Sequence, residues 1–334
     1  FLAGMDMYEN LSVGRTNDKY QHILPYYNFS TNLGYFNYGS VDFLSSGSNK
    51  LSNTNNLRSQ IINNFNYSTF DIYSKNGFRN DVNIFFKNLN TVGKNDTKYK
   101  SRPSMAVSSI FEVNSSIPLK KINKNSNEFL EPKISFRFNP GDMKNYNSDK
   151  RIINTDNIFD INRIGVNDTF EAGKSLTLGL DYKKEYNIKN KNLNTQDVND
   201  FFEFKLATSI RDEVENYLPT STTLNKKYSN LFGSIKNHYF ADTEKSLVDS
   251  LKVDYYFSLN NGLNDLEYNS LNGELVFNDF TTSIKFIEEN GPVGNSNIME
   301  NSFSYKFDDL NHLSFKTRRN RKINLTEYYD LMYE

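Results

Sequence analysis

The chain has 334 residues, enough for two ordinary domains or for one large all-β body. Aromatic residues make up 15% of it, with 27 Phe and 22 Tyr, which excludes a disordered chain because disordered segments are poor in aromatics. The net charge of -1 argues against a nucleic-acid partner, and the absence of Cys excludes disulfides and thiolate metal sites within these residues.

No run of residues approaches the roughly 18 apolar positions of a membrane-spanning helix. A spanning barrel strand needs only about 10 residues with every second one apolar, so a membrane location stays open. The chain starts at Phe1 without a signal-peptide pattern and stops within a strand-like segment, 324–334. We therefore expect an internal fragment of a longer protein.

The first clear hairpin surrounds an Asn-Gly pair at residues 76–77. A two-residue loop would place Ile72 opposite Asp81 and mix apolar with polar side chains on each face. A three-residue loop that ends at Gly77, with Gly77 in the left-handed region, places Phe70 opposite Val82 and keeps the two faces distinct. We predict the three-residue loop.

Other segments alternate apolar and polar side chains with the period of a β-strand. The clear ones are 133–138, 175–182, 202–207, 251–258 and 303–308, and the weaker ones are 5–13, 22–30, 34–45, 55–66, 105–114, 229–240, 270–278, 281–288, 311–318 and 324–334. This predicts about 15 to 17 strands and no convincing helix. Residues 212–217 have some helical character but are too few to matter.

Connection lengths favour a barrel over a sandwich. Tight turns at 261–262 and 290–291 alternate with long polar loops at 139–167, 187–199 and 211–228, a pattern typical of outer-membrane barrels. Alternation alone does not choose, because a soluble sandwich shows the same period with its apolar face inward. We predict an all-β, antiparallel, transmembrane outer-membrane β-barrel, partial, as a single incomplete barrel domain over residues 1–334.

The stretch 157–182 joins a polar loop to the clearest strand. Leu176, Leu178 and Leu180 point to one face of that strand and are expected to meet lipid, because Ser175 and Thr177 make the opposite face polar. The loop 139–167 is expected on the extracellular side, folded over or into the lumen. It has apolar anchors at Ile152, Ile153, Ile158, Phe159, Ile161 and Ile164 that a solvated loop would not need.

Charge and glycine support the same expectation for the loop. Arg163 has Asp160, Asp168 and Glu171 within reach along the chain, which are charge-assisted partners that can pin it. Gly165 and Gly173 permit tight backbone geometry on either side. We expect a structural role for the loop, around a transit path, rather than direct lipid contact.

Motifs that suggest catalysis do not hold up. Residues 173–175, Gly-Lys-Ser, end like a phosphate-binding loop, but position 168 is Asp instead of the required Gly and a strand follows instead of a helix. Asp168 and Glu171 lack the His, Lys or metal-ligand spacing that acid–base or metal chemistry needs, so loop hydrogen bonding is favoured. The three His residues, His22, His238 and His312, are isolated from one another.

A basic run near the end of the chain allows two interpretations. Arg318, Arg319, Arg321 and Lys322 can contact anionic groups such as lipid phosphates, or can form an ordinary charged turn, which we favour. No catalytic, cofactor-binding or metal site is predicted, and we expect that the chain is not an enzyme.

Residues 132–182 resemble the barrel domain of the LPS-assembly protein LptD family, also called organic solvent tolerance protein. The resemblance rests on a strand that begins in the Pro-containing segment EPKISFRFNP, a long loop, and an alternating strand; FEFKLATSIRDE is similar to the next family strand. The loop positions that match the family pattern are Asp156, Asn157, Phe159, Arg163, Gly165, Asp168, Glu171 and Gly173.

The resemblance implies a translocon that inserts lipopolysaccharide (LPS) into the outer leaflet of the outer membrane of a Gram-negative bacterium. In the family, an LptE lipoprotein plugs the lumen and periplasmic LptA delivers the lipid through an amino-terminal domain that is not present in this chain. The lipid leaves sideways through a gate between the first and last strands, without cofactors. The family barrel has 26 strands, more than this chain is predicted to contain, and family members have Cys residues that this chain lacks.

Two rivals from other classes stay open. A general or substrate-specific porin is compatible with the strand pattern, because about 16 strands close a porin. A soluble or surface-attached β-rich binding module would show the same alternation, but would pack its apolar faces between sheets and purify without detergent.

Overall fold

The computed structural model describes residues 1–9, 20–52, 55–186, 200–241, 248–308 and 311–334, which form a single 18-stranded antiparallel sheet. Within these ranges the one helical element is a 3-10 turn, η1 (Thr220–Thr222). No helix in the described part of the chain is long and apolar enough to cross a membrane.

The strands follow one another along the chain. They are β1 (Leu2–Glu9), β2 (Tyr20–Phe36), β3 (Gly39–Ser52), β4 (Asn56–Thr69), β5 (Ile72–Tyr73), β6 (Arg79–Lys94), β7 (Ser104–Ser116), β8 (Leu119–Ile122), β9 (Ser126–Asn139), β10 (Gly173–Tyr186), β11 (Phe201–Arg211), β12 (Leu231–Phe240), β13 (Ser250–Leu259), β14 (Leu266–Phe277), β15 (Phe280–Glu289), β16 (Ser296–Lys306), β17 (His312–Asn320) and β18 (Leu325–Tyr333).

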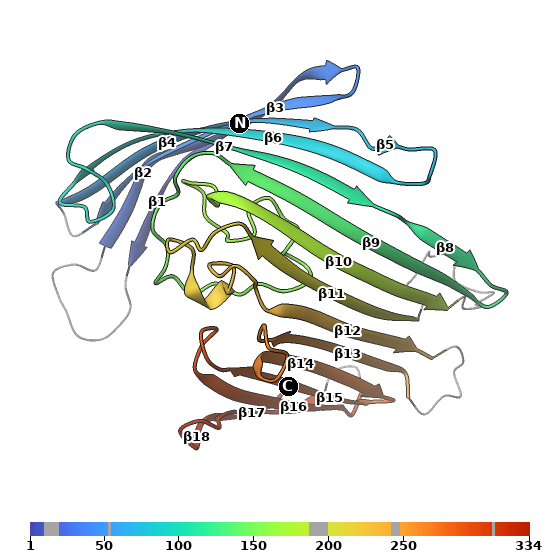
Figure 1. The fold of residues 1–334 in the computed structure, drawn as a ribbon. Helices are drawn as coiled ribbons and strands as arrows, with labels where there is room; N and C mark the ends of the chain where they lie inside the picture. The colour runs from blue at the N-terminus through green and yellow to red at the C-terminus, as the bar shows by residue number, and fades with distance from the viewer. Residues whose placement is uncertain (10–19, 53–54, 187–199, 242–247, 309–310) are drawn as a thin grey trace.

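The topology is a continuous meander. Two short strands extend the strands that precede them. β5 extends β4, because both pair with β6, and β8 extends β7, because both pair with β9. The 18 described strands therefore fill 16 positions across the sheet, so the count exceeds the predicted 15 to 17 strands only because the two short continuations are separate strands. Among the described strands, β1 pairs with β2 and β18 with β17, each along one edge. Figure 1 shows the sheet curving so that the connection between β9 and β10 lies inside it.

The two faces of the sheet decide between barrel and sandwich. On β10 the polar Thr177 is fully buried, whereas the apolar Leu178 is 39% exposed. Phe111 on β7 and Phe136 on β9 lie on the same exposed side as Leu178. The polar face therefore points inward and the apolar face outward, the reverse of a soluble sandwich.

The hairpin at residues 70–86 has the predicted turn. Ser74 N–H donates to the Phe78 carbonyl at 2.8 Å, which leaves residues 75–77 as the loop. Gly77 has a φ of 84°, in the left-handed region that favours glycine. The pairing of Ile72 with Asn80 continues the predicted register. The register slips by one residue between β5 and β4, a local irregularity that the alternation did not reveal.

Two predictions about the strands and loops were wrong. The segment 34–45 is not one strand, because β2 ends at Phe36 and β3 begins at its partner Gly39, so a two-residue turn divides it. Long loops and tight turns do not alternate between the two ends of the sheet. The connections 140–172 and 212–230 share an end, which we call the loop end, with the tight turns at 261–262 and 290–291. Residues 10–13 and the predicted loop 187–199 lie outside the described residues.

Candidate functional site

The connection between β9 and β10, residues 140–172, folds into the barrel, and we call it the inner loop. Three of its predicted apolar anchors, Ile153, Ile158 and Ile164, are buried to within 2%. They pack with Leu218 and Leu224 of the connection between β11 and β12, forming the main apolar cluster of the described residues. The expectation that this loop folds into the lumen is confirmed by its position, while its role stays a proposal.

A buried ion-pair network clamps the inner loop to the wall. Arg163 holds both carboxylate oxygens of Glu171, at 2.7 Å from Nε and 2.6 Å from Nη2. Its Nη1 also donates to the hydroxyl of Thr177 on β10 at 2.9 Å. From β11, Arg211 donates to the same Glu171 carboxylate and to the Ala172 carbonyl. The Arg163–Glu171 pair thus joins the loop to two neighbouring strands, to β10 through Arg163 and to β11 through Glu171.

The electrostatics of Glu171 explain why the clamp is stable. Burial by itself would raise the pKa of Glu171, but the charge and hydrogen bonds of Arg163, with the charge of Arg211, outweigh it and lower the pKa to about 2. The carboxylate therefore stays ionised at neutral pH. Bidentate contact satisfies its lone pairs, which is the condition under which a buried ion pair is tolerated.

Asp168 belongs to a second, separate network. It accepts hydrogen bonds from Tyr146 and, at 3.2 Å, from Tyr99, and it pairs with Lys98 at 2.9 Å and Lys144 at 3.3 Å. Burial opposes ionisation, but these partners lower the pKa of Asp168 to about 2. Tyr99 and Lys98 come from the connection between β6 and β7, so Asp168 fastens a neighbouring loop to the inner loop.

Asp156 makes a third attachment, to the strands that follow. The Tyr256 hydroxyl donates to it at 2.8 Å, and Lys236 and Lys205 lie within 3.2 and 3.5 Å. Burial would raise the pKa of Asp156, but these three groups lower it. The inner loop is therefore tied to β11, β12 and β13 at one end and to β10 and β11 at the other.

Asn157 and Phe159 shape the loop and seat it. The Asn157 amide donates to the Ile152 carbonyl at 3.0 Å and accepts from the Asn154 N–H at 2.9 Å, closing a local turn. The Phe159 carbonyl accepts from Arg137 of β9 at 2.5 Å. Its ring lies 4.3 Å from the Lys133 ammonium and over Gly179, where a Cβ would come within 2.6 Å of the ring.

The two glycines of the motif sit where an L side chain is strained. Gly165 has a φ of 64° and Gly173 a φ of 77°. A Cβ at Gly173 would also lie 3.1 Å from the Arg211 guanidinium. Gly173 therefore starts β10 in the one conformation that leaves room for the clamp.

The structure corrects the partner set predicted for Arg163. Of the three carboxylates within reach along the chain, Glu171 is its partner, whereas Asp160 is exposed and Asp168 serves the lysines. Sequence reasoning missed Arg211, and it missed Arg137, which pairs with Glu112 of β7 at 2.8 Å. The available signal was a charged residue on the inward face of a strand next to the loop.

The basic run 318–322 does not form a single cationic surface. Arg318 faces inward and pairs with Glu327 at 2.9 Å, while Arg319 donates to Asn324. Arg321 stacks 5.7 Å from the Phe286 ring, and the backbone N–H of Lys322 donates to Asn320. Both earlier interpretations of this run stay predictions.

Nothing in the described ranges assembles a reaction centre around the motif residues. Asp168 and Glu171 sit in different networks, each neutralised by cations. No group of three or more His, Asp or Glu side chains in the described part of the chain could hold a metal ion. His238 instead pairs with Asp254 at 2.9 Å. The arrangement fixes a loop in place.

Comparison with known proteins agrees with this geometry. Residues 82–246, about half of the chain, match the family model LptD, LPS transport system D. The chain belongs to the LptD family. The matched span runs from β6 through β12 and includes every motif residue of the inner loop. No curated protein matches the chain.

Membership in the LptD family gives the chain a general role and a fold. It is an all-β outer-membrane barrel with a part in LPS transport or assembly. The match extends the likeness beyond residues 132–182 on both sides, to β6, β7 and β8 before them and to β11 and β12 after them.

Proposed function

We propose that the chain is the barrel of a translocon that inserts LPS into the outer leaflet of the outer membrane. LPS passes through the polar lumen and leaves sideways between the first and last strands. LptD family membership supports the transport role, and the distribution of polar and apolar side chains over the two faces supports the path. The inner loop lies on the extracellular side and holds the barrel open around that path.

The observation that carries the proposal is a cavity of about 830 Å³ inside the barrel. The inner loop fills the side near β9 to β12, and the cavity lies between this loop and the inner faces of β1 to β6. Its wall includes Asn28, Gln60, Asn64 and Lys87, and its loop side includes Asn162. Amides and an ammonium suit a sugar–phosphate head group, which needs many hydrogen-bond partners.

The seam for the acyl chains is proposed between the first and last strands of the complete barrel. The cavity reaches Leu2 and Asp6 of β1, at one edge of the described sheet, so the lumen is open toward that edge. An edge strand exposes unpaired backbone groups, which is unfavourable in lipid unless the edge can close by pairing weakly with another strand. Such a seam can open for a passing lipid.

Partners follow from the same proposal. LPS is the substrate, an LptE-like lipoprotein occupies the lumen, and an LptA-like periplasmic bridge delivers LPS through an amino-terminal domain outside this chain. The protein performs no covalent chemistry and works in the outer membrane of a Gram-negative bacterium.

Depletion of the full-length protein in its own bacterium tests the proposal. We expect newly made LPS to stop reaching the cell surface, as measured by surface-specific labelling of LPS, before other outer-membrane proteins are lost. The porin alternative predicts normal surface LPS with reduced uptake of small solutes. The binding-module alternative predicts extraction without detergent. Either result would contradict the proposal.

A further inference from the structure

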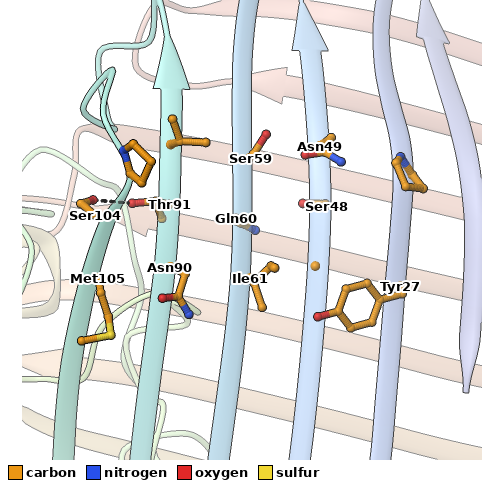
Figure 2. Close-up of a pocket in the computed structure, with 14 residues that line it drawn as sticks. Tyr27, Ser48, Asn49, Ser59, Gln60, Ile61, Asn90, Thr91, Ser104 and Met105 are labelled. Carbon is orange, nitrogen blue, oxygen red and sulfur yellow. Dashed lines mark hydrogen bonds between the residues drawn. The ribbon is translucent and has the colours of Figure 1, made fainter.

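A groove of about 430 Å³ lies on the outer face of the sheet, across β2 to β7. Tyr27, Gly47, Ile61, Asn90 and Met105 form one row of paired positions across five strands. Figure 2 shows Tyr27, Ile61, Asn90 and Met105 lying side by side in this row. The Tyr27 ring leans over Gly47, where a Cβ would come within 2.3 Å of it, so the groove depends on that glycine.

Beside the groove runs a chain of uncharged hydrogen bonds. Tyr27 and Ser45 share a hydrogen bond of 3.1 Å, and Ser45 donates to Asn63 at 2.7 Å. Asn63 donates to Asn88 at 3.2 Å, and Asn90 donates to the same Asn88 oxygen at 2.6 Å. We call Ser45, Asn63, Asn88 and Asn90 the outer polar row. Lipid-facing positions are usually apolar, so a row of amides there needs an explanation.

The outer polar row has hydrogen-bonding capacity left over. Among the described residues, the Asn88 side-chain nitrogen and the Asn90 side-chain oxygen have no hydrogen-bond partner, although each can make at least one bond. Both lie on the outer face, and Asn90 lines the groove. In hydrocarbon an unmatched amide is costly, so the ligand that fits must bring uncharged polar atoms together with apolar surface.

We propose that the groove binds an acyl chain of LPS, whose ester, amide or hydroxyl group bonds to Asn88 and Asn90. The chain itself would lie against Ile61, Val92 and Met105. The inference rests on the proposed function, which makes the loop end extracellular. The groove is in that half of the sheet, because Ser104 opens β7 and Ser59 lies near the start of β4. The leaflet it faces is then the one that contains LPS.

Shape and charge favour this occupant over a second copy of the chain. Two copies of a concave groove cannot fill each other across a two-fold axis, because an isologous contact needs a self-complementary surface. The groove is also uncharged, which suits ester and hydroxyl groups better than phosphates. It begins on β2, one strand from the edge strand β1, and its free amide groups belong to β6, so it serves as a resting site for lipid on the wall rather than as the exit.

The test compares two variants of the full-length protein extracted in mild detergent. Asn88→Leu combined with Asn90→Leu removes the free amides, and Ser109→Leu on β7 is the control, on the same outer face but outside the groove. Both place Leu where lipid-facing strands favour apolar residues, so both are expected to fold. Native mass spectrometry then measures the LPS retained per barrel.

We expect the double variant to retain about tenfold less LPS than the parent, as the loss of two neutral hydrogen bonds implies, and the control to retain the same amount. Equal retention in the double variant would overturn the proposal, as would retained phospholipid in place of LPS or a dimer in place of lipid. Surface labelling of LPS in depleted cells keeps the two proposals apart. Delivery that stops on depletion, with unchanged retention in the double variant, refutes the groove alone.

Discussion

Two walls of the barrel show the same alternation of polar and apolar side chains, but the inward polar side chains are buried on one wall and exposed on the other. Under the inner loop, on β9 to β12, the inward hydroxyls of Thr177 and Ser234 are fully buried and bonded to the loop. On β15 to β18 the inward Lys285 and Lys316 side chains are 61% and 44% exposed. An inward polar side chain is thus part of a fixed core on one wall and solvated on the other.

The ion pairs of the two walls show what this difference means energetically. In Arg163–Glu171 the side chains are 0% and 5% exposed, whereas in Arg318–Glu327 they are 39% and 33% exposed. When a buried charge loses its partner, no water can take the place of that partner, whereas water solvates an exposed charge. We therefore expect the covered wall to be sensitive to substitution and the open wall to tolerate it.

The largest effect is expected for Arg163→Ala. Removing the guanidinium leaves Glu171 beside Arg211 alone and leaves the Thr177 hydroxyl without its loop partner. Loss of one member of a buried pair costs about 3–5 kcal/mol of unfolding free energy. Urea unfolding of the detergent-solubilised barrel would measure this loss. A change no larger than that of an exposed pair would show that the clamp does not hold the fold.

Leu178→Arg tests the outer face of the same wall. If Leu178 meets lipid near the bilayer midplane, the substitution should lower the unfolding free energy by about 2–4 kcal/mol. Spin labels at Leu178 and Thr177 give an independent measurement. A lipid-soluble quencher should reach the label at 178 better, and the opposite order would contradict the assignment of the faces.

Acid should weaken the covered wall selectively. The pKa of Glu171 is about 2 in the folded protein against 4.5 for the free side chain, so its contribution is complete above pH 4.5 and is lost as the pH falls toward 2. When the pH falls from 7 to 3, the loss of this contribution should lower the unfolding free energy of the barrel by about 2 kcal/mol. The comparison is with Glu171→Gln, whose stability should vary less with pH over that range. Parallel curves for parent and variant would rule Glu171 out as the group responsible.

The smallest effect is expected for Arg318→Ala on the open wall. Its pair with Glu327 is partly solvated, and such pairs contribute about 0–1 kcal/mol. The same urea unfolding experiment applies. If this variant lost as much stability as Arg163→Ala, the contrast between the two walls would have no energetic basis.

The sequence predicted the parts of the fold that depend on period and on local turns. Strict alternation at 175–182 indicated which side of β10 was polar, and the separation of apolar from polar side chains on the two faces favoured the three-residue turn that ends at Gly77. The failure at 34–45 has a local reason. The turn consists of Asn37 and Tyr38, and Gly39 follows it. Asn and Gly favour turns, so a signal was present, but a two-residue turn is short enough to be taken as part of one strand.

The site was predictable only as far as contacts are local in sequence. Arg163 and Glu171 lie 8 residues apart, so their pairing could be anticipated. Arg211 lies 40 residues from Glu171 and reaches it because β11 pairs with β10. Asp160 and Asp168 are both closer to Arg163 along the chain than Glu171 is, and only the course of the loop separates them from it. Such choices depend on tertiary packing that periodicity does not encode.

Deleting residues 152–164 from the full-length protein tests most directly whether the inner loop holds the barrel around the transit path. The deletion removes Asp156, Phe159 and Arg163 together with all three buried anchors, Ile153, Ile158 and Ile164. Cells that rely on the deletion variant should assemble less folded barrel, show less surface LPS and admit large antibiotics that the parent excludes. Normal assembly with full exclusion of those antibiotics would contradict the account.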